Sequence, residues 1–140
     1  MAEFTAVAVQ TVAANQNVLF TETPICGGRG IYHREGSGIV TAKGNTGQCR
    51  ARYRVTFGAN IAVPTGGTVE AISVALALNG EPLASATAIV TPAAVEEFFN
   101  VSLSVFVDAP CGCCTDISVE NVSTQPILVQ SANLIVERVA

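Results

Sequence analysis

Five cysteines carry the clearest reactive potential in this sequence: Cys26, Cys49, Cys111, Cys113 and Cys114. Cys111 and Cys114 have the two-residue spacing of a zinc knuckle, but a second pair of this kind is missing and His33 is the only histidine. Two interpretations stay open: disulfides that join Cys26 or Cys49 to the later group, and buried free thiols. Because five is odd, one thiol stays free or pairs between subunits. We expect the cysteines to stabilise the fold, with no metal and no cofactor.

No other set of residues forms a catalytic signature. His33 would need a nearby nucleophile and an orienting acid, and no Gly-x-Ser-x-Gly or similar nucleophile motif is present. Glu96 and Glu97 are adjacent, so their side chains diverge and do not suit paired acid–base chemistry. The glycine-rich segment 27–30 lacks the Lys-Ser/Thr of a phosphate-binding loop. The sequence therefore predicts a protein that is not an enzyme.

Among the elements that would position these groups, segment 50–57 has the most regular pattern. Polar and apolar residues alternate there, which is typical of a strand with one exposed and one buried face. Its two faces are Arg50, Arg52 and Arg54 on one side, and Tyr53, Val55 and Phe57 on the other. No Lys or Arg occurs from 55 to 137, where eight acidic residues lie. We therefore expect the arginines to meet acids of the same subunit, of a neighbour or of a larger particle.

Net charge and composition exclude several classes of function. With a net charge of −4 and a pI near 4.8, binding of nucleic acid is not expected. Charged residues make up only 13% of the 140 residues, against roughly 25% in typical soluble domains. This shortage suggests that part of the surface lies in a subunit interface.

The first four residues lack the basic region of a secretion signal, and no apolar stretch approaches the roughly 20 residues of a membrane span. We expect synthesis in a cytoplasm and no membrane insertion.

Strand patterns follow one another along the chain, separated by Gly, Pro and Asn. Asn79-Gly80 is the strongest hairpin signal, since both residues tolerate positive φ in a type I′ turn. The one candidate helix is 92–98, with Thr91 as its N-cap. The expected strands are 5–13, 17–21, 31–34, 38–42, 48–62, 68–78, 82–91, 98–108, 115–122 and 127–139. This pattern predicts a single all-β domain.

The alternation of apolar and polar residues also separates a buried from an exposed face on two later strands. In 98–108 the odd positions are apolar and the even positions are mostly polar, but Phe106 lies on the polar face. Phe106 either covers a local gap or anchors an interface. In 68–78 the even positions from Ile72 to Leu78 are expected in the core. The small residues between them would form a flat outer face, which suits close packing against another sheet or subunit.

Five signals occur in a recognisable order: Ala-x-Asn-x-Asn-Val-Leu-Phe at 13–20, a hairpin at 31–40, Tyr53-x-Val55-x-Phe57, the Asn79-Gly80 hairpin, and a closing strand at 132–136. This order resembles the C1q/TNF-like jelly-roll superfamily, including bacterial and phage versions that end collagen-like or fibre proteins. The resemblance covers nearly the whole chain. More narrowly, the chain is similar to small proteins of gut Firmicutes and their prophages, some of which are capsid decoration or head-fibre proteins.

The resemblance implies a two-sheet antiparallel jelly-roll sandwich that assembles as a homotrimer about a three-fold axis. It places two strands near that axis, one with Tyr53, Val55 and Phe57 and one with Phe106. Together with the arginine face, this defines the predicted oligomer interface: Arg50, Arg52, Tyr53, Arg54, Val55, Phe57 and Phe106. The chain has no Gly-X-Y stalk. Residues 1–16, or a surface of its own, would therefore attach the jelly-roll domain 17–140.

These features predict a non-enzymatic, trimeric structural or display protein, most directly a decoration or head-fibre component on the surface of a phage virion. Its expected partners are further copies of itself, the capsid or another particle surface, and a host-surface glycan. The alternative is a secreted or surface-attached bacterial C1q-like module that binds a ligand. An enzyme of the cupin type would need clustered metal-binding histidines, and the chain has one histidine.

Overall fold

The computed structural model describes residues 2–25, 30–44, 50–110 and 114–139. Within these ranges the backbone forms eleven β-strands and no helix, and so no helix long and apolar enough to cross a bilayer. The strands are β1 (Ala2–Ala6), β2 (Gln10–Val12), β3 (Glu22–Ile25), β4 (Ile31–His33), β5 (Val40–Lys43), β6 (Arg50–Ala62), β7 (Ile72–Leu78), β8 (Glu81–Val90), β9 (Phe99–Pro110), β10 (Cys114–Asn121) and β11 (Ile127–Arg138).

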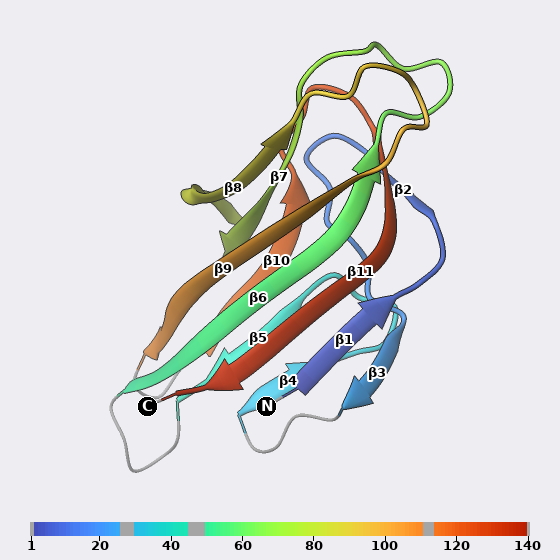
Figure 1. The fold of residues 1–140 in the computed structure, drawn as a ribbon. Helices are drawn as coiled ribbons and strands as arrows, with labels where there is room; N and C mark the ends of the chain where they lie inside the picture. The colour runs from blue at the N-terminus through green and yellow to red at the C-terminus, as the bar shows by residue number, and fades with distance from the viewer. Residues whose placement is uncertain (1, 26–29, 45–49, 111–113, 140) are drawn as a thin grey trace.

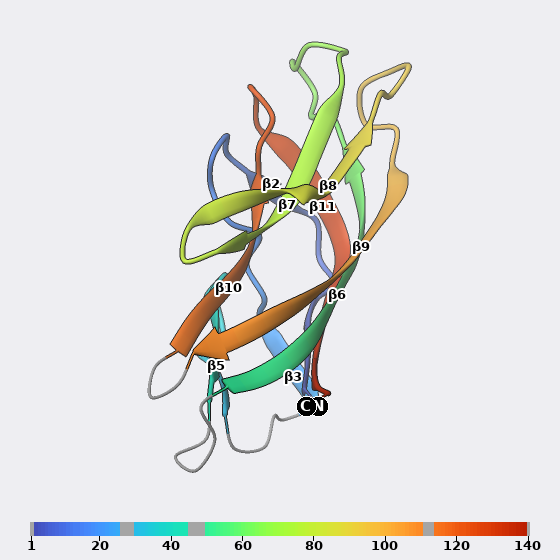
Figure 2. The same cartoon turned by 90° about the vertical axis from the view of Figure 1, so that its left-hand side faces the viewer.

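Two antiparallel sheets pack face to face as a sandwich (Figures 1 and 2). The six-stranded sheet has the order β3-β1-β11-β6-β9, with β2 paired to β11. The five-stranded sheet has the order β4-β5-β10-β7-β8. Many neighbouring strands are distant in sequence, such as β1 with β11 and β6 with β9. The predicted two-sheet antiparallel jelly roll is confirmed.

The core lies between the sheets and follows the alternation along each strand. On β6 the inward side chains Tyr53, Val55 and Phe57 are 0% exposed. Phe57 packs edge-on against Phe20, with ring centroids 6.4 Å apart. Burying a large apolar side chain in this way contributes about 1.5–3 kcal/mol relative to leaving it exposed. The buried face that the alternation predicted for this strand is confirmed.

Both hairpins expected from turn residues are present. Asn79 and Gly80, between β7 and β8, have φ of 53° and 85°, as a type I′ turn requires. The Asn79 N–H donates to the Asp116 carbonyl oxygen, and the Asn79 side-chain oxygen accepts from the Asp116 N–H, so this turn is tied to β10. β4 pairs with β5 in the register Tyr32↔Thr41, which places these two side chains on one face of the five-stranded sheet.

The helix predicted over 92–98 does not form. The segment is a bend and a turn between β8 and β9, and Glu96 adopts a left-handed φ of 58°. The Glu96 N–H donates to the Val63 carbonyl oxygen at 2.7 Å, and the Glu96 carboxylate accepts a hydrogen bond from the Thr65 hydroxyl. Seven residues are too few to form a stable helix alone, so these contacts with a neighbouring loop decide the backbone conformation.

The N-terminal residues belong to the same sandwich as the rest of the chain. β1 pairs with β11 along its whole length, and Phe4 is buried in the core. The fully buried Asn121 donates from its side-chain amide to the Val12 carbonyl oxygen at 3.0 Å, which ties β2 to the end of β10. The boundary predicted at residue 16 therefore does not separate two folding units. Attachment of the protein through residues 1–16 stays a prediction.

The flat outer face predicted for β7 is largely closed within the single chain. Ala75 and Ala77 are both 0% exposed, although they lie on the outer side of the sheet. Larger residues flank them on the adjacent strands, because Ala75 pairs with Glu120 and Thr87, and Ala77 pairs with Pro82. The prediction that these alanines offer a surface to a second sheet or subunit is therefore wrong.

Candidate subunit interface and ligand-binding surface

The outward face of β6 meets two neighbouring strands, because β6 lies between β11 and β9. Arg52 is paired across the sheet with Asp108 of β9. Its guanidinium contacts the carboxylate through two hydrogen bonds, Nε to Oδ1 at 2.8 Å and Nη2 to Oδ2 at 3.2 Å. This hydrogen bonding, together with the negative charge of Asp108, raises the pKa of Arg52 above its ordinary value.

Arg54 is neutralised on the opposite side of β6. Its Nη2 donates to Glu137 Oε2 of β11 at 2.9 Å, and the two residues are directly paired across the sheet. Both side chains are well exposed to solvent, as are those of the Arg52–Asp108 pair. Exposed pairs of this kind contribute little to stability. Their effect is to remove free positive charge from this face, so the acids that the arginines meet are those of the same chain.

Phe106 is the large apolar side chain that this face presents to solvent beside the two ion pairs. It lies on β9 directly opposite Arg54 and is 62% exposed. A ring so exposed does not fill a gap in the chain's own packing. That Phe106 anchors a contact with another molecule stays a prediction.

Three residues of the predicted interface lie in the core instead. Tyr53, Val55 and Phe57 point between the sheets and are 0% exposed, so their side chains cannot reach a neighbouring subunit. For these three the predicted interface role is wrong, because the alternation that exposes the arginines buries them. Arg50 begins β6, and its side chain lies outside the described part of the structure.

Tyr53 has a structural task that the sequence did not indicate. Its hydroxyl crosses the sandwich and donates to the Lys43 carbonyl oxygen at 2.8 Å, with the Gly30 carbonyl oxygen 3.4 Å away. Burial raises the pKa of the Tyr53 hydroxyl, an effect that the positive charge of Arg138 opposes. The bond fixes the open end of the β4–β5 hairpin to β6.

Most of the cysteine cluster cannot be placed. The residues Cys26, Cys49, Cys111 and Cys113 lie outside the described residues. Cys114 begins β10, where it is partly buried and pairs with Lys43 of β5. Within the described ranges, no group of three or more His, Cys, Asp or Glu residues could hold a metal ion. The choice between disulfides and thiols stays open.

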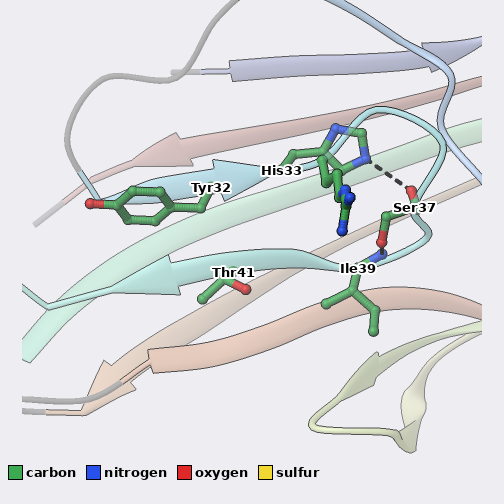
Figure 3. A pocket seen from close by; sticks show the side chains of 6 residues that line it. Tyr32, His33, Ser37, Ile39 and Thr41 are labelled. Carbon is green, nitrogen blue, oxygen red and sulfur yellow. Dashed lines mark hydrogen bonds between the residues drawn. The ribbon is translucent and has the colours of Figure 1, made fainter.

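His33 serves to shape a loop. Its Nε2 donates to the Ser37 carbonyl oxygen at 2.9 Å, which closes the turn between β4 and β5 (Figure 3). The ring packs on Phe4 with centroids 4.6 Å apart and faces Phe20 at 6.4 Å. Its Nδ1 is buried and has no hydrogen-bond partner among the described residues. With one nitrogen committed to the loop and the other held against aromatic rings, His33 is not arranged for acid–base catalysis.

The same hairpin carries a surface depression that the sequence did not indicate. It has a volume of about 420 Å³, is open to solvent, and is lined by Tyr32, His33, Arg34, Ser37, Ile39 and Thr41. Tyr32 and Ile39 lie toward opposite ends of it, with Thr41 between them (Figure 3). Thr41 donates to Asp116 Oδ1 at 2.9 Å. The signal was the alternation Ile31-Tyr32-His33-Arg34, which puts an aromatic residue and a cation on one outward face.

Comparisons with known proteins identify the fold. No protein-family model matches the chain, and no curated protein sequence matches it either. Murine APRIL at pH 5.0 superposes with a TM-score of 0.65 over 97% of this chain and 98% of its own, at 14% identity. The globular domain of zebrafish complement 1qA gives 0.56, 11% identity, and 96% and 94% coverage. The chain has the C1q/TNF-like jelly-roll fold.

Vertex protein P5 of PRD1 is a third solved structure with a similar fold. It superposes with a TM-score of 0.55 at 12% identity, over 99% of this chain and 96% of its own. Each match spans nearly the whole of both chains, so the fold likeness extends over nearly the whole of this chain. At 11–14% identity the likeness shows the fold alone. The roles of individual residues must therefore come from the contacts of this chain.

Proposed function

We propose that this chain is a non-enzymatic, homotrimeric display protein on the surface of a phage virion. The observation that carries the proposal is the fold likeness to vertex protein P5 of PRD1, which leaves almost no residue of either chain unmatched. The C1q/TNF-like resemblance implies the trimer.

The outer face of the six-stranded sheet is the surface proposed for self-association. Its two ion pairs offset the positive charges of Arg52 and Arg54 with the carboxylates of Asp108 and Glu137. Further along β6 and β9 the outward residues are small or uncharged: Thr56, Gly58, Asn60, Asn100, Ser102 and Ser104. Small side chains allow a second backbone to come close, and hydroxyl and amide groups can form hydrogen bonds across the contact. Phe106 would be the apolar anchor at one end of this face.

Size-exclusion chromatography with light scattering tests the trimer. We expect a single species at three times the 14.4 kDa mass of one chain at micromolar concentration. Arg52→Glu should weaken this species, because it replaces an ion pair with two carboxylates directly opposite each other. A wild-type monomer at the same concentration would sink the proposal.

Mass spectrometry of purified virions tests the location. Intact particles from an induced host should contain the chain in a fixed ratio to the major capsid protein, and immunogold labelling should decorate their surface. Portal, protease and capsid genes beside its own gene would agree with this result. Absence of the chain from particles, while host cells contain it, would rule out the virion role.

The second candidate function is a secreted or surface-attached bacterial C1q-like module that binds a ligand. The depression on the β4–β5 hairpin favours it, because a purely structural subunit has no need of an open aromatic and cationic surface. Surface proteolysis and fractionation of bacterial cells would separate the two candidates. A cell-surface protein is removed by protease from intact cells, whereas a virion protein is released only with particles.

A further inference from the structure

The β4–β5 hairpin holds positive charge that no carboxylate of the described residues neutralises. Arg34 and Lys43 are both exposed, and neither forms an ion pair with a described acid, in contrast to Arg52 and Arg54. Lys43 instead places its Nζ 4.6 Å from the centre of the Tyr32 ring. Tyr32 is 53% exposed. A free guanidinium and an exposed aromatic ring therefore share one small depression.

We propose that this depression binds an acidic saccharide, meaning a sugar ring that bears a carboxylate. The Arg34 guanidinium matches a carboxylate with two parallel hydrogen bonds. The Tyr32 ring offers a flat surface for the C–H face of a sugar, and Ile39 supplies apolar contact at the other end. Thr41 lines the depression between them and can exchange hydrogen bonds with sugar hydroxyls, and Asp116, beyond Thr41 in the same cross-strand row, can accept them. A small ligand with one anionic group and several hydroxyls satisfies all of these groups.

The negative charge of Asp116 favours a particular orientation of the sugar. One of its oxygens accepts the Thr41 hydrogen bond, and Asp116 lies on β10, two strands away from the β4 edge. A sugar carboxylate is therefore held at Arg34, and neutral hydroxyls face Asp116. This arrangement distinguishes an acidic sugar from a free inorganic anion, which would gain nothing from Thr41 and Asp116.

The site is held rigid before any ligand arrives. Tyr53 fixes the Lys43 backbone from the core, and His33 fixes the Ser37 turn. The pairing Tyr32↔Thr41 sets the distance between the aromatic ring and the hydroxyl. Preorganisation of this kind lowers the entropy lost on binding.

This inference deepens the proposed function, since it rests on a display role that contacts host-surface glycans. The two surfaces do not compete, because the depression lies on the five-stranded sheet and Phe106 lies on the six-stranded sheet. A trimer formed through the six-stranded sheet would leave three depressions free. Trimer mass and sugar binding are measured separately, so failure of one leaves the other intact.

Isothermal titration of the purified full chain tests the site with three probes: the methyl glycoside of N-acetylneuraminic acid, methyl glucuronide and neutral methyl glucoside. We expect one or both acidic sugars to bind at least about tenfold more tightly than the neutral one. Arg34→Ala should weaken acidic-sugar binding about tenfold, and Tyr32→Ala should weaken all sugar binding. Arg54→Ala is the control for loss of one positive charge, because Arg54 lies on the other sheet, and it should leave sugar binding unchanged.

Three results would overturn the site. The first is no heat from either acidic sugar at millimolar concentration with a folded protein. The second is equal loss of binding in the Arg34 and Arg54 variants, which would show nonspecific attraction to positive charge. The third is an affinity for methyl glucoside equal to that for each of the two acidic sugars, which would remove Arg34 from recognition. Circular dichroism of each variant establishes that it is folded.

Discussion

The outer face of β6 and the outer face of the β4–β5 hairpin contain similar residues but present different surfaces. Both place arginine beside an exposed aromatic side chain, Phe106 in one case and Tyr32 in the other. On β6 each described arginine is paired with a carboxylate of the same chain, whereas Arg34 on the hairpin is paired with none among the described residues. The number of arginines on a strand therefore does not tell how much positive charge that strand offers to a partner.

The position of each strand in its sheet explains the difference. β6 is an inner strand, so an outward side chain has a neighbour on both sides, and Asp108 and Glu137 occupy those positions. β4 is an edge strand with β5 on one side only. An outward group at an edge has fewer chances of meeting an opposite charge within the chain. Arg34 lies in the turn that follows this edge strand, whereas Lys43 on the inner strand β5 also forms no ion pair with a described acid, so strand position is only part of the explanation.

The largest expected effect is on stability, and it tests whether Phe57 of β6 belongs to the core or to a subunit interface. Phe57→Ala removes a ring that is 0% exposed and packs on Phe20. We expect the free energy of unfolding to fall by about 3–5 kcal/mol, measured by urea denaturation. If Phe57 instead served a subunit contact, the variant would stay as stable as the wild type at low protein concentration and would only dissociate.

Phe106→Glu should leave the stability of a single chain unchanged and weaken its self-association. Its ring is exposed, so the fold of one chain should remain intact. Loss of the aromatic anchor and burial of a carboxylate should weaken self-association by about 2 kcal/mol, or roughly thirtyfold in dissociation constant. Sedimentation velocity over a range of concentrations measures this. Unchanged association would remove Phe106 from the interface, and Ile89→Glu, an exposed position on the other sheet, is the control.

Tyr53→Phe should weaken the link between β6 and the β4–β5 hairpin. It deletes the hydroxyl that donates to Lys43 and leaves that carbonyl oxygen without this donor, which should cost about 1 kcal/mol of unfolding free energy. The Tyr53 pKa is raised above 10.0, so the unfolded chain loses this proton first as the pH rises. Wild-type stability should therefore be constant below about pH 10 with respect to this group and fall above it.

The phenylalanine variant supplies the check on that pH dependence. It lacks the titrating hydroxyl, so its urea midpoint should fall less steeply above pH 10 than that of the wild type. Parallel curves for the two proteins would show that Tyr53 does not titrate differently in the folded and unfolded states.

Local patterns in the sequence predicted the architecture well. Alternation identified the buried face of β6, and Asn79-Gly80 identified the β7–β8 turn, because both depend on neighbouring residues alone. Two of the failures depend on contacts between distant segments. The helix at 92–98 is prevented by a bond to Val63, and Ala75 is flanked by residues of two other strands.

The candidate sites were predicted less completely for the same reason. The sequence shows that Arg52 and Arg54 share a face, but their partners lie 56 and 83 residues away. The depression at Tyr32 needs the register of β5 and β10 against β4, which no local pattern reveals. From the sequence, the residues that line this depression were predicted only to form a hairpin of the fold.

The smallest expected effect concerns the ion pair that makes the arginine face neutral. A double-mutant cycle of Arg54→Ala and Glu137→Ala should give a coupling energy below about 1 kcal/mol, because both side chains are partly exposed and water competes for them. The coupling should shrink further at 1 M salt. If assembly buries this face, the same cycle measured on the trimer should give a larger value than on dilute monomer, since desolvation strengthens the attraction. Equal values in both states would mean that the pair stays in water, and that subunits meet elsewhere.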